Sequence, residues 1–347
     1  MELRQCGTSD LRLPALGVGS WAFGGGDYWG PCEQSGVDEL VRYAVERGCN
    51  FFDTAELYYN GGSETSLGLA VKTLDRGTVL IGSKISPANT EPARLTAHCE
   101  ASLRRLQTDY IDLYMVHWPI TQRAIRSFTS EKMPTPSVTD AFATLMRLQR
   151  EGKIRHIGVS NFGRAKLDEA LATGAAIVIN ELPYSLLTRA IEIEILPYCE
   201  ARGVGVLGYS SLLQGVLGDD FATLDDVPVM QRRTRHFDSR RNPQIRHGLP
   251  GEEAETAAAL EAIRALARSH GLSTAELALK WAMAGPGLTC SLCGCRTVGK
   301  LAANIKAASE PISPDLREKL NLVTQPLMEK LGSSFDYWQN PSQDRTV

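Results

Sequence analysis

Four polar side chains suited to proton transfer stand where short apolar runs end. Asp53 closes NFFD, Tyr58 follows five residues later, Lys84 closes VLIGSK, and His117 follows DLYMV. A tyrosine can protonate a carbonyl oxygen, a nearby cationic lysine favours its phenolate, and a carboxylate keeps that lysine charged. A histidine can orient the carbonyl oxygen through a hydrogen bond. The four residues therefore predict carbonyl reduction, with Tyr58 as the general acid.

Each of these residues, taken alone, also has a purely structural explanation. Asp53 could cap a helix, and Tyr58 could be a surface aromatic. Lys84 could extend from a strand end into water, and His117 could pack beside Trp118. Three strand ends that supply an Asp, a Lys and a His, with a Tyr in the loop after the first, form a much rarer combination. The combination favours the catalytic interpretation.

Short apolar runs alternate with amphipathic stretches along the whole chain. Eight of these runs are expected as strands: 15–21, 49–56, 78–85, 111–118, 156–161, 176–184, 203–210 and 288–295. Runs that are apolar on both faces are typical of buried parallel strands. Eight strands alternating with helices predict an α/β fold, a single (β/α)8 TIM barrel domain spanning 1–347. No G-x-G-x-x-G follows the first strand, which disfavours a doubly wound dinucleotide fold.

Three segments interrupt this alternation, and a fourth precedes the barrel. Residues 1–14 predict a β-hairpin that plugs the lower mouth of the barrel. Long loops at 120–136 and 212–250 and a tail at 332–347 are expected at the face that carries the strand C-termini, where barrel active sites form. The loop at 212–250 contains six arginines: Arg232, Arg233, Arg235, Arg240, Arg241 and Arg246. The stretch 232–246 could be a solvated loop, or it could place one or two guanidinium groups on a phosphate or an anionic substrate.

Bulk properties restrict the partners and the compartment. The net charge of -3, with both signs mixed, indicates neither a nucleic acid nor a membrane partner. The N-terminus has no apolar signal region and no stretch of 18 apolar residues occurs, so a cytoplasmic protein is expected. The eight cysteines lack framework spacing, which favours reduced thiols. Cys290, Cys293 and Cys295 have no neighbouring histidine and predict a buried strand rather than a metal site.

Several blocks of the sequence resemble those of the aldo-keto reductases. The resemblance runs from LGVGSW to NIKAA and includes FFDTAELY, GSK, SLRRLQTDYIDLYMVHWP, GKIRHIGVSNF and GCRTVGKLAANIKAA. It looks closer to the bacterial sugar- and polyol-related branches. The resemblance implies an NADP-dependent oxidoreductase on a (β/α)8 barrel that interconverts a carbonyl compound and its alcohol by hydride transfer. The alternative is an NADP-binding regulatory or redox-sensing subunit with little turnover, which would not need all four proton-transfer residues.

The resemblance also implies how NADP(H) would bind. Ser160 and Asn161 would hold the nicotinamide carboxamide, and Tyr209 would stack on the ring. The backbone of SSLLQG would wrap the pyrophosphate, and Arg296 and Lys300 would favour NADP over NAD. The residues expected at the cofactor are Gly19, Ser20, Trp21, Asp53, Ser160, Asn161, Glu181, Tyr209, Ser210, Ser211, Leu212, Leu213, Gln214, Gly215, Gly294, Arg296, Thr297, Lys300 and Asn304.

Some positions depart from the family pattern. Glu181 stands where the family commonly has Gln, and an ionised Glu cannot donate a hydrogen bond. We hypothesise that Glu181 shifts the bound cofactor toward NADP+ by Coulomb attraction. Ser211 replaces a usual Pro, Ala303 replaces a frequent Glu, and Asp220 stands where relatives can carry Lys. The arginines of 232–246 could compensate for that lysine by covering the pyrophosphate.

The substrate is less strongly indicated than the chemistry. The side chains expected to contact it are Trp21, Tyr28, Tyr58, His117 and Trp118, with Trp29 close by at the pocket mouth. Aromatic faces suit sugar rings and flat apolar molecules equally, and a polar, hydroxylated carbonyl compound is expected from the branch resemblance alone. The tail from Phe335 to Trp338 could close over the substrate or pack on the barrel exterior. The sequence indicates neither the oligomeric state nor the direction of the reaction.

Overall fold

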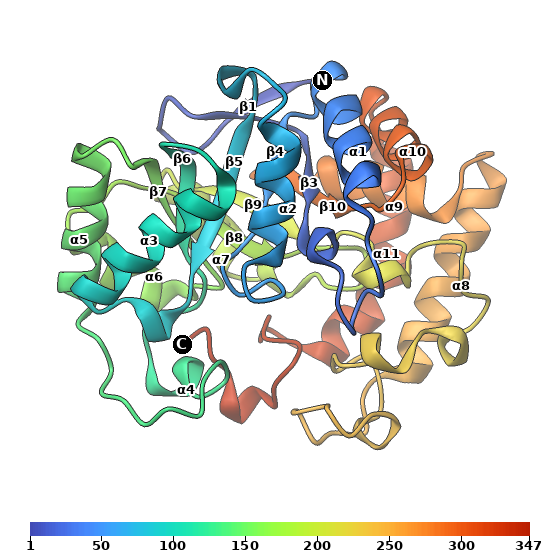
Figure 1. The fold of residues 1–347 in the computed structure, drawn as a ribbon. Coiled ribbons are helices and arrows are strands. Elements are labelled where there is room, and N and C mark those ends of the chain that lie inside the picture. The colour runs from blue at the N-terminus through green and yellow to red at the C-terminus, as the bar shows by residue number, and fades with distance from the viewer.

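The computed structural model describes all 347 residues and contains a closed barrel of eight parallel strands (Figure 1). The barrel strands follow one another around it in chain order: β3 (Leu16–Gly19), β4 (Phe51–Asp53), β5 (Leu80–Ile85), β6 (Ile111–Val116), β7 (Ile154–Ser160), β8 (Ile177–Pro183), β9 (Gly205–Tyr209) and β10 (Leu288–Gly294). The barrel closes where β10 pairs with β3. The eight predicted strands and the (β/α)8 architecture are confirmed.

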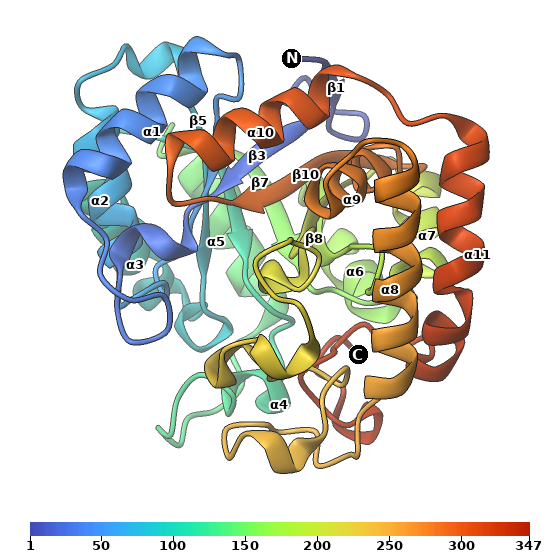
Figure 2. The same ribbon diagram turned by 90° about the vertical axis from the view of Figure 1, so that its right-hand side faces the viewer.

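Helices surround the barrel because their apolar faces need a partner (Figure 2). The longer ones between the strands are α1 (Gln34–Glu46), α2 (Gly62–Val71), α3 (Pro92–Leu106), α5 (Val138–Arg150), α6 (Arg164–Leu171), α7 (Ile195–Ala201), α8 (Glu253–Ser269) and α9 (Thr274–Met283). After β10 come α10 (Val298–Ser309) and α11 (Pro314–Leu331). Their buried residues join the outward-facing strand residues in one large core. Ser137, Ser273 and Thr297 cap the helices that they precede, each worth about 1 kcal/mol.

The predicted N-terminal hairpin is present, as β1 (Leu3–Gln5) paired antiparallel with β2 (Arg12–Pro14). Its buried residues Cys6 and Leu13 pack on Phe51 and Leu113 in a second apolar cluster inside the barrel. Arg4 Nη1 donates to the carbonyl of Met283, at 2.7 Å, just before β10. The hairpin therefore covers one end of the barrel, and the opposite end is left to the loops.

The three long segments meet at the other end of the barrel. The loop at 120–136 contains the short helix α4 (Gln122–Ile125), and Arg123 Nη1 donates to the Asp344 carbonyl at 2.7 Å. Arg235 Nη1 donates to the Leu331 carbonyl at 2.6 Å, which ties the loop at 212–250 to the start of the tail. Phe335 is buried in the core, while Trp338 lines the central cavity. The tail therefore lies across the barrel mouth, next to α4 (Figure 1).

The helices, the potential metal ligands and the cysteines bear on the other properties expected from the sequence. None of the helices combines the length and the apolar character needed to cross a bilayer. No group of three or more His, Cys, Asp or Glu side chains is placed to hold a metal ion. All eight cysteines are free thiols, and seven are buried. Cys290, Cys293 and Cys295 lie in or directly after β10, and burial raises the pKa of each thiol.

Candidate active site

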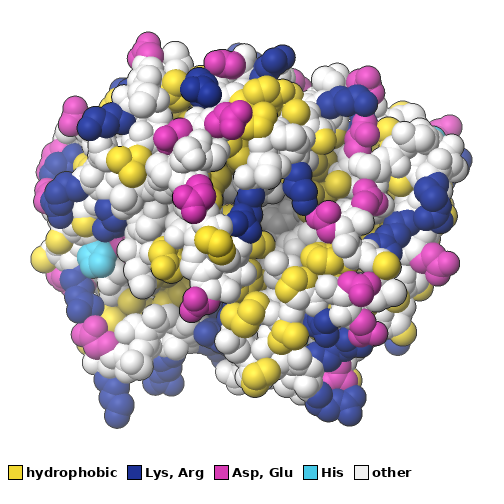
Figure 3. Space-filling model, turned by 45° about the vertical axis from the view of Figure 1, so that its right-hand side comes forward, with side chains coloured by type: hydrophobic (Ala, Val, Ile, Leu, Met, Phe, Trp, Pro, Cys, Tyr) yellow, Lys and Arg dark blue, Asp and Glu magenta, His cyan; other side chains and the backbone are white.

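A cavity of about 1200 Å³ opens at the face where the strands end. Figure 3 shows this hollow in the molecular surface, with Lys and Arg side chains close to its rim. Strand ends form its floor and the three long segments form its upper walls. The cavity is large enough for a dinucleotide together with a small substrate.

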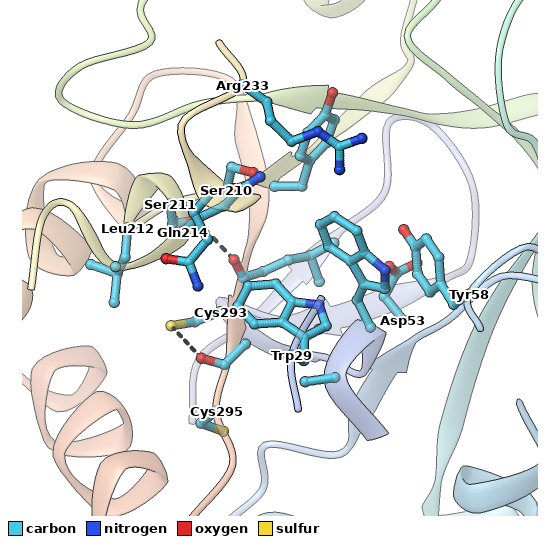
Figure 4. Close-up of a pocket in the computed structure, with 18 of the residues that line it drawn as sticks. Trp29, Asp53, Tyr58, Ser210, Ser211, Leu212, Gln214, Arg233, Cys293 and Cys295 are labelled. Atoms are coloured by element: carbon cyan, nitrogen blue, oxygen red, sulfur yellow. Dashed lines mark hydrogen bonds between the residues drawn. The ribbon is translucent and has the colours of Figure 1, made fainter. Parts of the chain in front are cut away.

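Lys84, Asp53 and Tyr58 form a compact cluster on this floor. Lys84 is completely buried, and its Nζ lies 2.6 Å and 2.5 Å from the two carboxylate oxygens of Asp53. The same ammonium donates to the Thr54 carbonyl at 3.0 Å and to the Tyr58 hydroxyl at 3.3 Å. These contacts bring together three of the four residues proposed for proton transfer. They leave the phenol partly exposed to the cavity, where Figure 4 shows Tyr58 beside Asp53.

In this cluster, burial and neighbouring charges shift the pKa values of the side chains in opposite directions. Burial raises the pKa of Tyr58, and the neighbouring Lys84 cation acts against this rise. Burial alone would lower the pKa of Lys84, but the Asp53 and Glu181 carboxylates outweigh it, so the net pKa is raised. Lys84 therefore stays charged. The net pKa of the phenol is higher than the sequence alone led us to expect, because desolvation exceeds the lysine's effect.

Glu181, in the C-terminal half of β8, is a fourth member of this cluster. Its Oε2 lies 3.3 Å from Lys84 Nζ but accepts no hydrogen bond of good geometry. Burial and the Asp53 charge raise the pKa of Glu181 to about 8, against the pull of Lys84. A carboxyl group with this pKa is mostly protonated at neutral pH, so it can donate a hydrogen bond as a glutamine would. One buried lysine cannot balance two ionised carboxylates at this site.

The loop that carries Tyr58 is held in place by a neighbouring glutamate. Glu56 accepts from the Ser86 amide and from Asn89 Nδ2, both at 2.8 Å, and pairs with His98 at 2.6 Å. The loop then turns through Tyr59, Asn60 and Gly61, which all have positive φ values. Such a turn is strained for the first two residues, so the Glu56 contacts help to fix it.

His117 lies at the end of β6 and is tied to the next strand ends. Its carbonyl accepts from Asn161 Nδ2 at 3.1 Å, and Asn161 Oδ1 accepts from the Tyr209 hydroxyl at 2.7 Å. Asn161 has a φ of 63°, a conformation that asparagine tolerates better than most residues. Burial and the charges of Lys84 and Arg345 lower the pKa of His117 well below its usual value. The imidazole is therefore neutral, and its Nδ1 is buried without a hydrogen-bond partner.

The far end of the cavity carries the cationic residues expected at the adenosine. Arg296 Nη1 donates to the Trp29 carbonyl at 2.6 Å and its other terminal nitrogen donates to Pro31, so backbone carbonyls hold the guanidinium without neutralising it. Lys300 pairs with Asp220 at 2.6 Å across the cavity wall, and both side chains are largely exposed. Thr297 caps α10, and its side chain accepts from the Lys300 amide.

Most of the residues expected at the cofactor line this cavity. They are Gly19, Trp21, Asp53, Ser160, Asn161, Glu181, Tyr209, Ser210, Ser211, Leu212, Gln214, Gly215, Gly294, Arg296, Thr297, Lys300 and Asn304. Ser20 and Leu213 do not line it. Ser20 Oγ donates to the Asp53 carbonyl at 2.6 Å and so positions β4, while the side chain of Leu213 is buried in the core.

Of the residues expected at the substrate, Trp21, Tyr58, His117 and Trp118 line the cavity and Tyr28 does not. Tyr28 instead lies behind the wall, stacked on Trp21 with ring centroids 4.9 Å apart, and donates to Gln214 Oε1 at 2.6 Å. It therefore supports the wall, and it joins the loop after β3 to the loop after β9.

Several further residues line the cavity, and of these the sequence indicated only Trp338, through the tail from Phe335 to Trp338. Phe128 stacks on His117 with centroids 6.1 Å apart, and Trp338 stacks on Tyr209 at the same separation. Arg345 is buried, and its guanidinium lies 3.9 Å from the centroid of the Trp118 ring. These residues come from irregular segments, where no periodic pattern indicates which side chains face inward. Only the aromatic content of the tail gave a signal.

Comparison with known proteins places this geometry in a family. The aldo/keto reductase family matches residues 15–322. The chain belongs to the aldo-keto reductases. It is 29% identical to the aldo-keto reductase YhdN of Bacillus subtilis, over 96% of this chain and 97% of that protein. It is 31% identical to the NADH-specific methylglyoxal reductase of Escherichia coli, over 88% of this chain and 93% of that protein.

A solved structure of the family supports the same assignment. The chain is 26% identical to an aldo/keto reductase from Klebsiella pneumoniae, crystallised with NADP and acetate. The two structures match with a TM-score of 0.69 over 93% of this chain and 96% of that one. Members of this family are oxidoreductases that use nicotinamide cofactors on small carbonyl compounds, and this chain shares their barrel.

Proposed function

We propose that this protein is an NADP-dependent carbonyl reductase in which Tyr58 is the general acid. The single observation that carries the proposal is the contact of 3.3 Å between Lys84 Nζ and the Tyr58 hydroxyl, inside a cavity bounded by a neutral His117. A lysine this deeply buried is costly unless it has a partner such as Asp53, and the phenol is the one group of the cluster that is partly open to the cavity.

The chain's own residues supply the proton side of this reaction. The neutral imidazole of His117 would donate a hydrogen bond to the carbonyl oxygen and so fix its position. As negative charge develops on that oxygen, the Tyr58 hydroxyl would transfer its proton to it, and Lys84 would stabilise the resulting phenolate. Asp53 would hold Lys84 in place. The cofactor, when bound, supplies the hydride.

The residues of the cavity fit a nicotinamide dinucleotide. Tyr209 presents a ring at the end of β9, and Ser160 and Asn161 offer polar groups beside it. The cationic Arg296 lies at the other end and favours a 2′-phosphate, hence NADP over NAD. Lys300 contributes less, because Asp220 partly neutralises it. The NADP-bound Klebsiella structure supports this preference, whereas the Escherichia coli relative is NADH-specific.

The proposal can be tested by following NADPH absorbance with a panel of aldoses, ketoses, methylglyoxal and aromatic aldehydes. We expect turnover with at least one class of carbonyl compound, and a loss of at least about 100-fold in kcat for Tyr58→Phe. Tyr59→Phe is the matched control, because Tyr59 is exposed and does not line the cavity. Tight NADPH binding without oxidation by any of these compounds would instead favour a cofactor-sensing subunit.

A further inference from the structure

The six arginines of the loop at 212–250 divide into two groups. Four of them hold the loop or the tail together, through backbone carbonyls or carboxylates: Arg232, Arg235, Arg240 and Arg241. The remaining two, Arg233 and Arg246, line the cavity and have no carboxylate partner. Figure 4 shows Arg233 extending into the cavity from the side opposite Asp53. The loop therefore directs two unbalanced positive charges at the space where a ligand would bind.

A third guanidinium, that of Arg345, reaches the same space from the tail but is neutralised. Its Nε and Nη2 each lie 2.7 Å from a carboxylate oxygen of Asp336, and both residues are buried. Burial and the nearby charges of Arg345 and Arg233 lower the pKa of Arg246, so the three guanidinium groups lie within electrostatic reach of one another. One carboxylate facing three guanidinium groups leaves an excess of two positive charges.

Contacts place this excess charge beside the catalytic residues. Arg246 Nη1 donates to the carbonyl of Ser127 at 3.3 Å, and the adjacent Phe128 stacks on His117. Arg345 covers the ring of Trp118, the residue after His117. The adenosine end, with Arg296, is formed by other elements, namely β10 and α10. The unbalanced charge of Arg246 therefore belongs to the substrate end of the cavity.

We propose that the substrate is a carbonyl compound bearing a carboxylate or phosphate group, held by Arg246 while its carbonyl oxygen meets Tyr58 and His117, with Arg233 adding positive charge nearby. This proposal rests on the reductase function proposed above. A planar guanidinium can donate two parallel hydrogen bonds to either anion, and an anion there relieves the repulsion between the arginines. Trp118 and Phe128 would enclose the carbon chain between the two polar ends.

The test compares matched substrates that differ in charge. One pair is 4-formylbenzoate and its neutral methyl ester, and the second is glyceraldehyde 3-phosphate and glyceraldehyde. Dissociation constants for the NADP+-loaded protein come from quenching of tryptophan fluorescence, and kcat/KM comes from NADPH oxidation. We expect the anionic member of at least one pair to bind about tenfold or more tightly and to show a correspondingly higher kcat/KM. The pair with the larger ratio separates a carboxylate from a phosphate substrate.

Three variants localise the effect. Arg246→Gln should lower kcat/KM for the anionic substrate about tenfold more than kcat/KM for its neutral partner, whereas Arg246→Lys should retain part of the anion preference because the charge is kept. Arg240→Gln is the matched control, since Arg240 lies in the same loop, pairs with Asp238 and does not line the cavity. The affinity for NADPH should stay the same in all three variants.

Several results would overturn the proposal. Equal affinity of the wild type for the anionic and neutral members of both pairs would do so. So would a weaker affinity for NADPH in Arg246→Gln with an unchanged substrate preference, because the arginine would then serve the cofactor pyrophosphate. If neither member is reduced but the anion still binds tenfold more tightly, the anion site stands and the reductase function fails. If both members are reduced at equal rates, the reductase function stands and the anion site fails.

Discussion

Replacing Glu181 by Gln should stabilise this protein at alkaline pH and not at acidic pH. Glu181 is buried beside Asp53, and its pKa is raised from the ordinary value of 4.5 to about 8. Between these two values the unfolded chain has lost the proton while the folded chain retains it, so the free energy of unfolding falls as pH rises. Above pH 8 the accumulated cost is up to about 5 kcal/mol. Glutamine has the shape of the protonated acid and carries no such cost.

Thermal unfolding at pH 5 and pH 9 measures this effect. For a chain of this length, 1 kcal/mol corresponds to about 1–2 °C in Tm, so Glu181→Gln should gain roughly 5–10 °C at pH 9 and little at pH 5. Glu318→Gln is the control, because Glu318 is exposed and forms no ion pair. A Tm for Glu181→Gln that falls at pH 9 would refute the reasoning, since it would mean that an ionised Glu181 stabilises Lys84.

The same titration bears on the hypothesis that Glu181 favours the oxidised cofactor. A protonated Glu181 exerts no Coulomb attraction on a cationic nicotinamide, so the effect should emerge only as pH rises through about 8. We expect the ratio of NADP+ affinity to NADPH affinity in the wild type to exceed the same ratio in Glu181→Gln at pH 9. At pH 6 the two ratios should be equal. Equal ratios at both pH values would contradict the hypothesis.

Three further predictions concern the charges around the cavity. Asp220→Asn should tighten NADPH binding about two- to fivefold, because it frees Lys300 from an exposed ion pair. Isothermal titration calorimetry measures this change, and the affinity for NADH, as the control, should stay the same. Asp336→Asn should lower the free energy of unfolding in urea by about 3–5 kcal/mol, because the buried Arg345 loses its partner; an unchanged unfolding midpoint would contradict this. Lys84→Met should lower kcat by about 100-fold or more while NADPH binding persists, and wild-type turnover at pH 7 would contradict the role given to the lysine.

The sequence was informative wherever regular elements place the residues. The eight strands could be predicted because buried parallel strands are short apolar runs, and Asp53, Lys84 and His117 follow from their ends. Parallel strands in a closed barrel present their C-termini at one face, so residues distant in sequence had to converge. Tyr58 could be predicted to lie near these three residues, because it follows Asp53 by only five positions.

The parts that the sequence could not predict depend on tertiary contacts of irregular segments. The pairing of Arg345 with Asp336, and the burial of both, arises because the tail crosses the barrel mouth, and no periodicity reports that path. Tyr28 was expected at the substrate, but it is turned toward Gln214 by a hydrogen bond between two loops. Likewise, Arg233 and Arg246 are the two loop arginines that face the cavity, because carboxylates and carbonyls hold the other four.

The central claim is that Tyr58 protonates the carbonyl oxygen with Lys84 beside it. A single-turnover stopped-flow experiment tests this most directly, mixing NADPH-loaded protein with the best substrate and comparing wild type, Tyr58→Phe and Tyr59→Phe. Absorbance of the bound NADPH should decay rapidly in wild type and Tyr59→Phe, and at least about 100-fold more slowly in Tyr58→Phe, although all three bind NADPH equally. Equal decay rates in wild type and Tyr58→Phe would contradict it.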